Sequence, residues 1–248
     1  MDFFYVFLVG TIIGSFLNVI IYRIPIGESI ISPPSHCGNC DSRLRPLDLI
    51  PILSWIALKG KCRYCSSKIS YRYPFVELLT GGLFLFTYIA VGIDQKLVAY
   101  LVLGCMLIIN TFIDMDHFIL PNIILLFGLI AFVPLTVFLP FISWRDSFLG
   151  AFVGAVPLLI LFLLTKGRGM GPGDVKFMGV IGLYLGWKLS LLTLFLSFIL
   201  GGIFGILLLA TRIKDKTDAI PFGPWIALAA FISMYWGRNI ISWYLGVR

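Results

Sequence analysis

Residues 3–22 read FFYVFLVGTIIGSFLNVIIY, and this uncharged run decides the class of fold. A hydrocarbon core about 30 Å thick is crossed by ~20 helical residues, so the run predicts a membrane-spanning helix. It is longer than the apolar stretch of a usual signal peptide, and Asp2 precedes it where a signal peptide would carry a base. We therefore expect a retained first span whose N-terminus lies outside the cell.

Apolar runs of this kind make up most of the 248-residue chain. Hydrophobic residues account for 59% of it and charged residues for 12%, against about 25% charged residues in soluble domains. This composition excludes a secreted domain, a DNA-binding module and a disordered tail, and it predicts an all-α polytopic membrane protein. Further expected spans are residues 74–92, 97–113, 121–140, 147–165, 189–211 and 221–236, the last with a continuation to residue 245.

A shorter apolar stretch, residues 175–187, decides how often the chain crosses the membrane. If it is a span of its own, 14 of the 19 Lys and Arg residues fall on one side, as the positive-inside rule favours. The segments on that side are 23–73, 114–121, 165–176 and 212–219, and the bases lie in all of them except 114–121. We therefore expect about eight transmembrane helices with both termini outside. The net charge of +7 then reflects cytosolic loops and not a nucleic-acid partner.

The only long polar segment follows the first span and contains four of the five cysteines. It reads Cys37-Gly-Asn-Cys40, then 21 residues, then Cys62-Arg-Tyr-Cys65. Paired C-x-x-C turns at about this spacing are typical of a structural tetrathiolate zinc site. Free thiols, a disulfide or a redox pair are the alternatives, but the bases place the segment in the reducing cytosol. We expect residues 1–22 to form the first helix, 23–73 a cytosolic zinc-binding domain, and 74–248 a membrane domain.

Acidic residues are few, and some of them lie where the expected spans meet the cytosol. Asp114 and Asp116 close the third span, and Asp174 opens the sixth. Carboxylates at such depth are costly unless they are partnered, which makes them functional candidates, although a solvated helix end is the simpler alternative for each one. Two carboxylates brought together share a proton, so that one activates water and the other protonates a leaving group. Glu77 is a supporting candidate, or an acid favoured by the dipole of its helix.

Glycines surround the last of these acids in Met170-Gly171-Pro172-Gly173-Asp174. Without a Cβ, Gly171 and Gly173 would let a substrate backbone pass close to Asp174. Because this sequence does not continue a helix smoothly, we expect residues 168–174 to form a mobile loop over a cytosol-open cavity between the third and sixth spans.

Several stretches together are similar to those of a known family. They are residues 14–25 (GSFLNVIIYRIP), the C-x-x-C pairs, residues 71–78 (YRYPFVEL), 114–122 (DMDHFILPN) and 171–176 (GPGDVK). This combination resembles the type IV prepilin leader peptidases over essentially the whole chain, and its compact length is most similar to the competence-type members.

The resemblance implies a membrane aspartic endopeptidase of the G-x-G-D kind in a bacterial cytoplasmic membrane. Asp114 and Asp174 would be its catalytic pair, and Asp116 falls where related enzymes commonly have a basic residue. Its substrates would be prepilin-like proteins, whose short basic leader is removed after a glycine at the cytosolic face. Many members also methylate the new N-terminus with S-adenosylmethionine. Since the bases of segment 23–73 would repel a basic leader, we expect them to face anionic lipid headgroups.

Two other functions remain open from the residues alone. One is a transporter or channel with a structural zinc loop, although that would place polar residues at several mid-membrane positions. The other is a membrane thiol–disulfide oxidoreductase, which would need its cysteines on the oxidising side.

Overall fold

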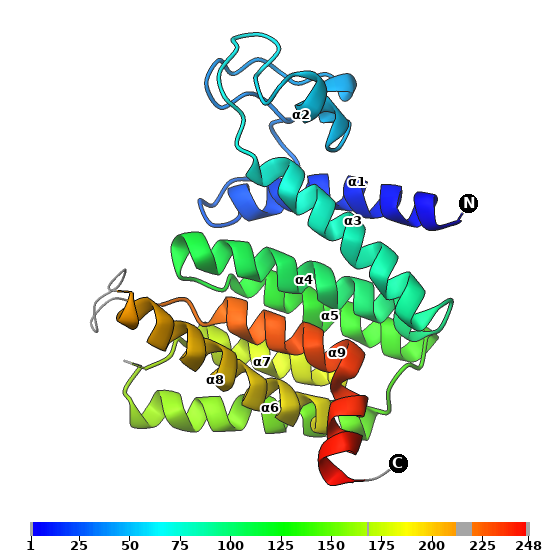
Figure 1. The fold of residues 1–248 in the computed structure, drawn as a ribbon, viewed down its shortest axis with the longest axis vertical. Helices are drawn as coiled ribbons and strands as arrows, with labels where there is room; N and C mark the ends of the chain where they lie inside the picture. Colours follow the sequence, from blue (N-terminus) through cyan, green and yellow to red (C-terminus); the bar gives the residue numbers. More distant parts are fainter. Residues whose placement is uncertain (1, 168, 212–219, 247–248) are drawn as a thin grey trace. The chain divides into compact units, whose positions relative to one another are not determined.

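The long helices of the chain coincide with the expected membrane spans (Figure 1). The computed structural model describes residues 2–167, 169–211 and 220–246, and within them it is helical and free of strands apart from two isolated bridges. Its eight long helices are α1 (Asp2–Arg23), α3 (Arg72–Val91), α4 (Lys96–His117), α5 (Asn122–Phe138), α6 (Trp144–Leu164), α7 (Pro172–Leu185), α8 (Trp187–Ala210) and α9 (Gly223–Leu245). Five of these, α1, α3, α4, α6 and α8, are long and apolar enough to cross a membrane. The chain is an all-α, multi-pass membrane protein.

The ambiguous stretch at residues 175–187 forms a helix of its own. Helix α7 ends at Leu185 and α8 begins at Trp187, with Gly186 between them. Gly186 has a φ of 78°, which a residue with a side chain adopts only at a cost, so the glycine separates two helices that would otherwise run together. The bases at positions 212, 214 and 216, whose expected cytosolic side supports this separate helix, lie outside the described residues.

The chain folds as two compact units, residues 1–93 and 94–248. In the first unit, α1 packs along α3 through small residues. A Cβ placed on Gly10 would lie 2.8 Å from the Cα of Gly81, so glycine allows the two backbones to approach closely. Such small residues are the usual contact of helices within a membrane, where no hydrophobic force drives helices together.

Between α1 and α3 the chain forms the polar insertion predicted from the cysteines. It contains a 3-10 helix, η1 (Pro46–Leu49), and a short helix, α2 (Leu53–Ala57). Buried Arg23 at the end of α1 anchors the start of the insertion, because its guanidinium donates hydrogen bonds to the carbonyl oxygens of Ser29 and Pro33.

Helix α7 is the centre of the second unit. It packs against α4, α5, α6, α8 and α9, and nine of its 14 residues are buried. Gly150 of α6 meets Gly182 of α7 backbone to backbone, and the Ser190 hydroxyl donates a 2.9 Å hydrogen bond to the Gly150 carbonyl. A helix of 14 residues is about 21 Å long, shorter than the hydrocarbon core.

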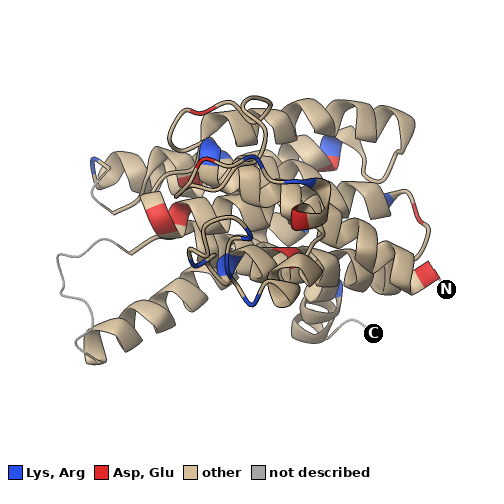
Figure 2. Cartoon of the chain, turned by 90° about the horizontal axis from the view of Figure 1, so that it is seen from above, with Lys and Arg blue, Asp and Glu red and all other residues tan. Residues whose placement is uncertain are grey.

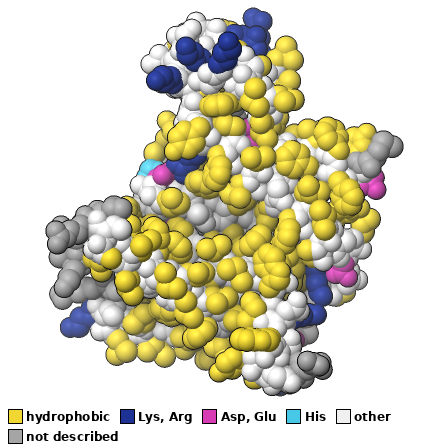
Figure 3. Space-filling view, viewed as in Figure 1, with side chains coloured by type: hydrophobic (Ala, Val, Ile, Leu, Met, Phe, Trp, Pro, Cys, Tyr) yellow, Lys and Arg dark blue, Asp and Glu magenta, His cyan; other side chains and the backbone are white. Residues whose placement is uncertain are grey.

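The surface divides by chemistry. Most of the helical ribbon carries neither acidic nor basic residues (Figure 2). In the space-filling view, apolar side chains cover much of the surface over the long helices, whereas Lys and Arg gather on the polar insertion (Figure 3). This is the distribution of a protein whose helices face lipid and whose insertion lies outside the hydrocarbon core.

Candidate active site

Asp114 lies in the last turn of α4 and is buried, with 5% of its surface exposed. Its Oδ2 accepts a 2.9 Å hydrogen bond from the backbone N–H of Gly223, the first residue of α9. Asp116 is exposed because two residues turn a helix by about 200°, which directs it away from the buried face. The structure therefore separates the two acids that the sequence places side by side.

Asp174 is the third residue of α7 and is also buried, with 7% of its surface exposed. Its Oδ2 accepts a 3.1 Å hydrogen bond from the backbone N–H of Gly171, the N-cap of the helix. The predicted loop 168–174 is wrong at its C-terminal end, since residues 172–174 already belong to α7. Proline is favoured at the first helical position, where its missing N–H has no intrahelical partner to lose. Residue 168 lies outside the described residues.

The two glycines of this motif have different surroundings. A Cβ on Gly173 would lie 3.0 Å from the Cβ of Leu120, so this glycine lets the start of α7 approach the turn after α4. A Cβ on Gly171 would meet Asp174 Oδ2 at 3.5 Å, an ordinary contact. Close packing thus requires a small residue at 173 more strictly than at 171.

Asp114 and Asp174 are brought together at one end of the second unit. Helix α4 packs against α7, and the two carboxylates are near enough to interact electrostatically. At the same end, Lys176 Nζ donates a 2.9 Å hydrogen bond to Asn122 Oδ1, which joins the starts of α7 and α5. Two buried carboxylates of opposite protonation state can act as base and acid in hydrolysis.

Glu77 belongs to the first unit. It is buried in α3, where its Oε2 accepts a 2.7 Å hydrogen bond from the backbone N–H of Ile52 and its carboxylate also bonds the Ser15 side chain. The surroundings of Glu77 thus consist of α1 and the polar insertion.

The four cysteines of the insertion converge as their spacing predicts. The Sγ atoms of Cys37, Cys40, Cys62 and Cys65 all lie within 4.8 Å of one another, and those of Cys37 and Cys65 are 3.8 Å apart. A tetrahedral ion with bonds to sulfur of about 2.3 Å requires neighbouring sulfurs about 3.8 Å apart. The cluster therefore has the size and the soft donors of a tetrathiolate metal site.

The two C-x-x-C pairs form two turns with the same hydrogen-bond pattern. In the first, Cys37 N–H donates to Ser42 O and Asp41 N–H donates to Cys37 O. The second turn repeats this pattern 25 residues later. There Cys62 N–H donates to Ser67 O, and Ser66 N–H donates to Cys62 O. Asp41 and Ser66 both have a left-handed backbone, with φ of 53° and 59°. The signal for this internal repeat is the shared pattern of two cysteines, one residue, a serine and a base.

Hydrogen bonds favour the thiolate form of two of these cysteines, Cys37 and Cys65. Backbone N–H groups of Asn39 and Cys40 lower the pKa of Cys37. The Ser67 hydroxyl, and then the Ser67 backbone, lower the pKa of Cys65 to about 6. Thiolates, not thiols, are the metal ligands.

Asp48 connects η1 to the second turn. Its carboxylate accepts hydrogen bonds from Arg63 Nε at 2.6 Å and from the Tyr64 hydroxyl at 3.0 Å. Burial alone would raise the pKa of Asp48, but the bonds from Arg63 and from the backbone of Arg45 hold it below its usual value. The carboxylate thus remains charged and holds the insertion together near the cysteines.

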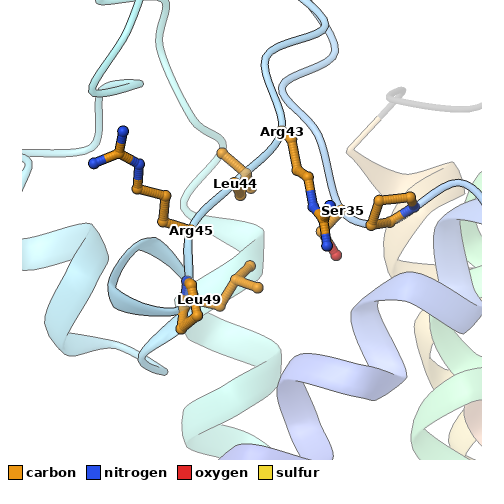
Figure 4. A pocket seen from close by; sticks show the side chains of 7 residues that line it. Ser35, Arg43, Leu44, Arg45 and Leu49 are labelled. Atoms are coloured by element: carbon orange, nitrogen blue, oxygen red, sulfur yellow. The ribbon is translucent and has the colours of Figure 1, made fainter.

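A cavity of about 450 Å³ lies in the same insertion, lined by Pro34, Ser35, Arg43, Leu44, Arg45, Pro46 and Leu49. Figure 4 shows the guanidinium of Arg43 beside Ser35, whereas the side chain of Arg45 extends in another direction. The two charges do not converge on one point, as they would in a dedicated anion site.

Sequence reasoning did not select Gly223, the residue that contacts Asp114. The two residues are 109 positions apart, and no pattern in the sequence links them. The available signal was the run Pro221-Phe222-Gly223-Pro224, in which a glycine stands directly at the start of a helix.

Comparisons with known proteins identify the family of the chain. A model described as the bacterial peptidase A24 N-terminal domain matches residues 8–91, and one for the type IV leader peptidase family matches residues 101–206. A prepilin leader peptidase/N-methyltransferase of Bacillus subtilis (strain 168) is 38% identical and aligns over 96% of both chains. Proteins of the same name from Aeromonas salmonicida (strain A449) and Pseudomonas aeruginosa are 37% and 35% identical, over 97% and 96% of this chain and 92% and 91% of their own. No solved structure matches the chain. With both parts of the chain matched and its relatives aligned almost from end to end, the chain belongs to the type IV leader peptidase family.

Proposed function

We propose that the chain is a membrane aspartic endopeptidase that removes the short basic leader of prepilin-like proteins after a glycine. Asp114 and Asp174 are its catalytic pair. The observation that carries this proposal is the burial of both carboxylates at one end of the second unit, each held by a backbone N–H. The names of the relatives, which describe leader peptidases acting on prepilins, support the substrate class.

In the proposed reaction one aspartate is ionised and takes a proton from water, which attacks the scissile carbonyl carbon. The other aspartate is protonated and gives its proton to the departing amine. Two carboxylates in a low-dielectric site share one proton readily, because ionising both would place like charges side by side. Gly171 and Gly173 lie next to Asp174, where a substrate backbone must pass.

The active site faces the cytosol in the proposed topology. Asp114 and Asp174 share an end of their unit with Lys166 and Lys176, and the positive-inside rule places such bases in the cytosol. A prepilin leader is basic and cytosolic, so its cleavage point would lie at this depth of a bacterial cytoplasmic membrane. Arg168, Arg212, Lys214 and Lys216 also belong to this side by sequence but lie outside the described residues.

We assign the metal of the four-cysteine cluster as structural zinc. Four sulfur ligands close the tetrahedral site, which leaves no open position for substrate. Residues 23–73 are then a zinc-binding domain between the first transmembrane helix, residues 1–22, and the peptidase domain, residues 74–248. The metal would join the two repeated turns, because each turn contributes two of the four ligands.

The zinc domain contacts anionic lipid headgroups in this proposal. Its exposed bases are Arg43, Arg45, Lys59, Lys61, Arg63 and Lys68. Beside them Leu47, Leu53 and Ile56 of η1 and α2 are 67%, 64% and 59% exposed. Apolar side chains flanked by bases are typical of segments that lie in a membrane interface, and a nucleic-acid partner is not proposed.

The chain also methylates the N-terminus that cleavage creates, as the names of its relatives describe for those proteins. The methyl donor of this activity is S-adenosylmethionine. Among the residues that line the cavity of about 450 Å³ in the zinc domain there is no acid to hold a ribose and no aromatic ring to stack on adenine. That cavity does not fit the cofactor, and we assign no step to it.

Incubation of the purified protein with a prepilin tests the peptidase directly. Release of the leader, seen by mass spectrometry, distinguishes a peptidase from a transporter and from a thiol oxidoreductase. The same spectrum reports methylation as a gain of 14 Da on the new N-terminus when S-adenosylmethionine is added. An intact prepilin after prolonged incubation with folded protein would contradict the proposal.

A further inference from the structure

The start of α9 forms a seat for the carboxylate of Asp114. The Gly223 N–H donates to Asp114 Oδ2 over 2.9 Å, and both residues are buried. In a buried site such a bond is stronger than in water, and a charged acceptor makes it stronger still.

A side chain at position 223 would displace the carboxylate of Asp114. A Cβ on Gly223 would lie 2.7 Å from Oδ2, 3.1 Å from Cγ and 3.3 Å from Cβ of Asp114. All three nearest atoms belong to that one side chain. The requirement for glycine at 223 thus arises from Asp114 itself.

Aromatic contacts with α8 fix the position of the seat. The ring of Phe222 lies 5.5 Å from that of Phe198, and the ring of Trp225 lies 4.4 Å from that of Phe204. A Cβ on Gly201 of α8 would lie 3.0 Å from Phe222 Cε2, so the two elements are closely apposed. These contacts on both sides of Gly223 pack the start of α9 against α8.

The electrostatics of α4 explain why Asp114 needs a partner from elsewhere. Asp114 stands in the last turn of α4, where the helix dipole is negative and disfavours a carboxylate. The 23-residue helix α9 begins at Gly223 and presents its positive end to the same carboxylate. Asp174 has no such conflict, because it lies at the N-terminus of its own helix.

We propose that Gly223 is a positioning residue of the peptidase, whose N–H orients the carboxylate of Asp114 and favours its ionised form. This inference rests on the proposed function, in which Asp114 is catalytic. Fixing one carboxylate oxygen leaves the other to accept the proton of water. The start of α9 is then a third part of the active site, together with the end of α4 and the start of α7.

The first test compares Gly223→Ala with Gly202→Ala in prepilin cleavage. Gly202 is an exposed glycine of α8 where a Cβ would meet nothing within 4 Å, which makes it a matched control. Losing a hydrogen bond to a charged group corresponds to about a 10- to 100-fold effect. We expect Gly223→Ala to lower kcat by that factor with KM changed less than about twofold, and Gly202→Ala to change neither. A folded Gly223→Ala enzyme with an unchanged kcat would overturn the proposal.

The second test needs no activity. The unfolding temperature is measured for Gly223→Ala alone and in an Asp114→Ala background, where the crowding carboxylate is absent. We expect the alanine at 223 to lower the unfolding temperature of the otherwise native chain and to have little effect in the Asp114→Ala background. If Gly223→Ala alone does not fold, Asp114→Ala should restore folding. An equal loss in both backgrounds, or no restoration, would overturn the proposal. Failure of the proposed function would be seen separately, as cleavage at the normal rate by Asp114→Asn.

Discussion

The backbone N–H of Ile52 donates a 2.7 Å hydrogen bond to Oε2 of Glu77, so a carboxylate of membrane helix α3 holds the polar insertion in place. Ile52 has φ 62° and ψ −51°, a backbone conformation that is rare for a β-branched residue. Since Ile52 is the N-cap of α2, the hydrogen bond from its N–H to Glu77 supports the helix start at a strained position.

Glu77→Ala should therefore loosen the insertion while leaving the long helices intact. A lost hydrogen bond to a charged group costs about 1.5–3 kcal/mol. We expect this loss to lower the stability of the insertion and not that of the long helices. Limited trypsin digestion measures this local loss of stability, because trypsin cleaves after Lys and Arg and the residues Lys59, Lys61 and Arg63 follow α2. We expect cleavage there to become at least about tenfold faster. Glu77→Gln is the control, since its amide oxygen can still accept from Ile52. Equal digestion of both variants would contradict this role.

Asp114→Asn and Asp174→Asn should each lower prepilin cleavage by about 100-fold or more, the usual contribution of a general acid or base. Both variants should fold, because an asparagine oxygen can still accept the hydrogen bond from Gly223 or Gly171. Asp116→Asn is the control on the exposed face of the same helix and should retain most of the activity. Cleavage at the normal rate by Asp174→Asn would contradict the proposed mechanism.

The metal site makes a prediction that does not depend on catalysis. Purified protein should contain about one zinc per chain, and replacing Cys37 and Cys40 with serine should remove it. Replacing Cys62 and Cys65 should have the same effect, because the two turns are structurally equivalent. Since structural zinc contributes folding energy directly, residues 23–73 should then become sensitive to protease. Cys105→Ser in α4, outside the cluster, should retain the metal. A cysteine-depleted protein with unchanged metal content would contradict the assignment.

Local patterns in the sequence predicted the elements of this fold but not its long-range contacts. Apolar runs, together with the expectation that Lys and Arg lie on the cytosolic side, identified residues 175–187 as a separate helix. The C-x-x-C spacing identified the cysteine cluster. The contact between Asp114 and Gly223 could not be predicted, because it depends on how α8 and α9 return to the end of α4. Likewise, the bond from Ile52 to Glu77 joins a short helix in a polar insertion to a membrane span. The predicted start of α7 is wrong for a local reason: Pro172 and its neighbouring glycines suggest a loop, whereas the proline is the first residue of the helix.

The bases and exposed apolar side chains of the zinc domain predict a position in the membrane interface. Each Lys or Arg near an anionic surface contributes about 1 kcal/mol of attraction, and salt screens it within about 10 Å. A spin label at position 56, on the exposed side of α2, should therefore become more accessible to oxygen dissolved in lipid when the protein is moved from neutral to anionic nanodiscs. Added salt, or the double change Lys59→Glu and Lys61→Glu, should reverse this gain. A label at exposed position 38, where a Cβ would meet no neighbour within 4 Å, is the control and should remain accessible to a water-soluble relaxation agent. If position 56 is shielded from both agents in every lipid, another part of the protein covers this surface, and its contact with headgroups is refuted.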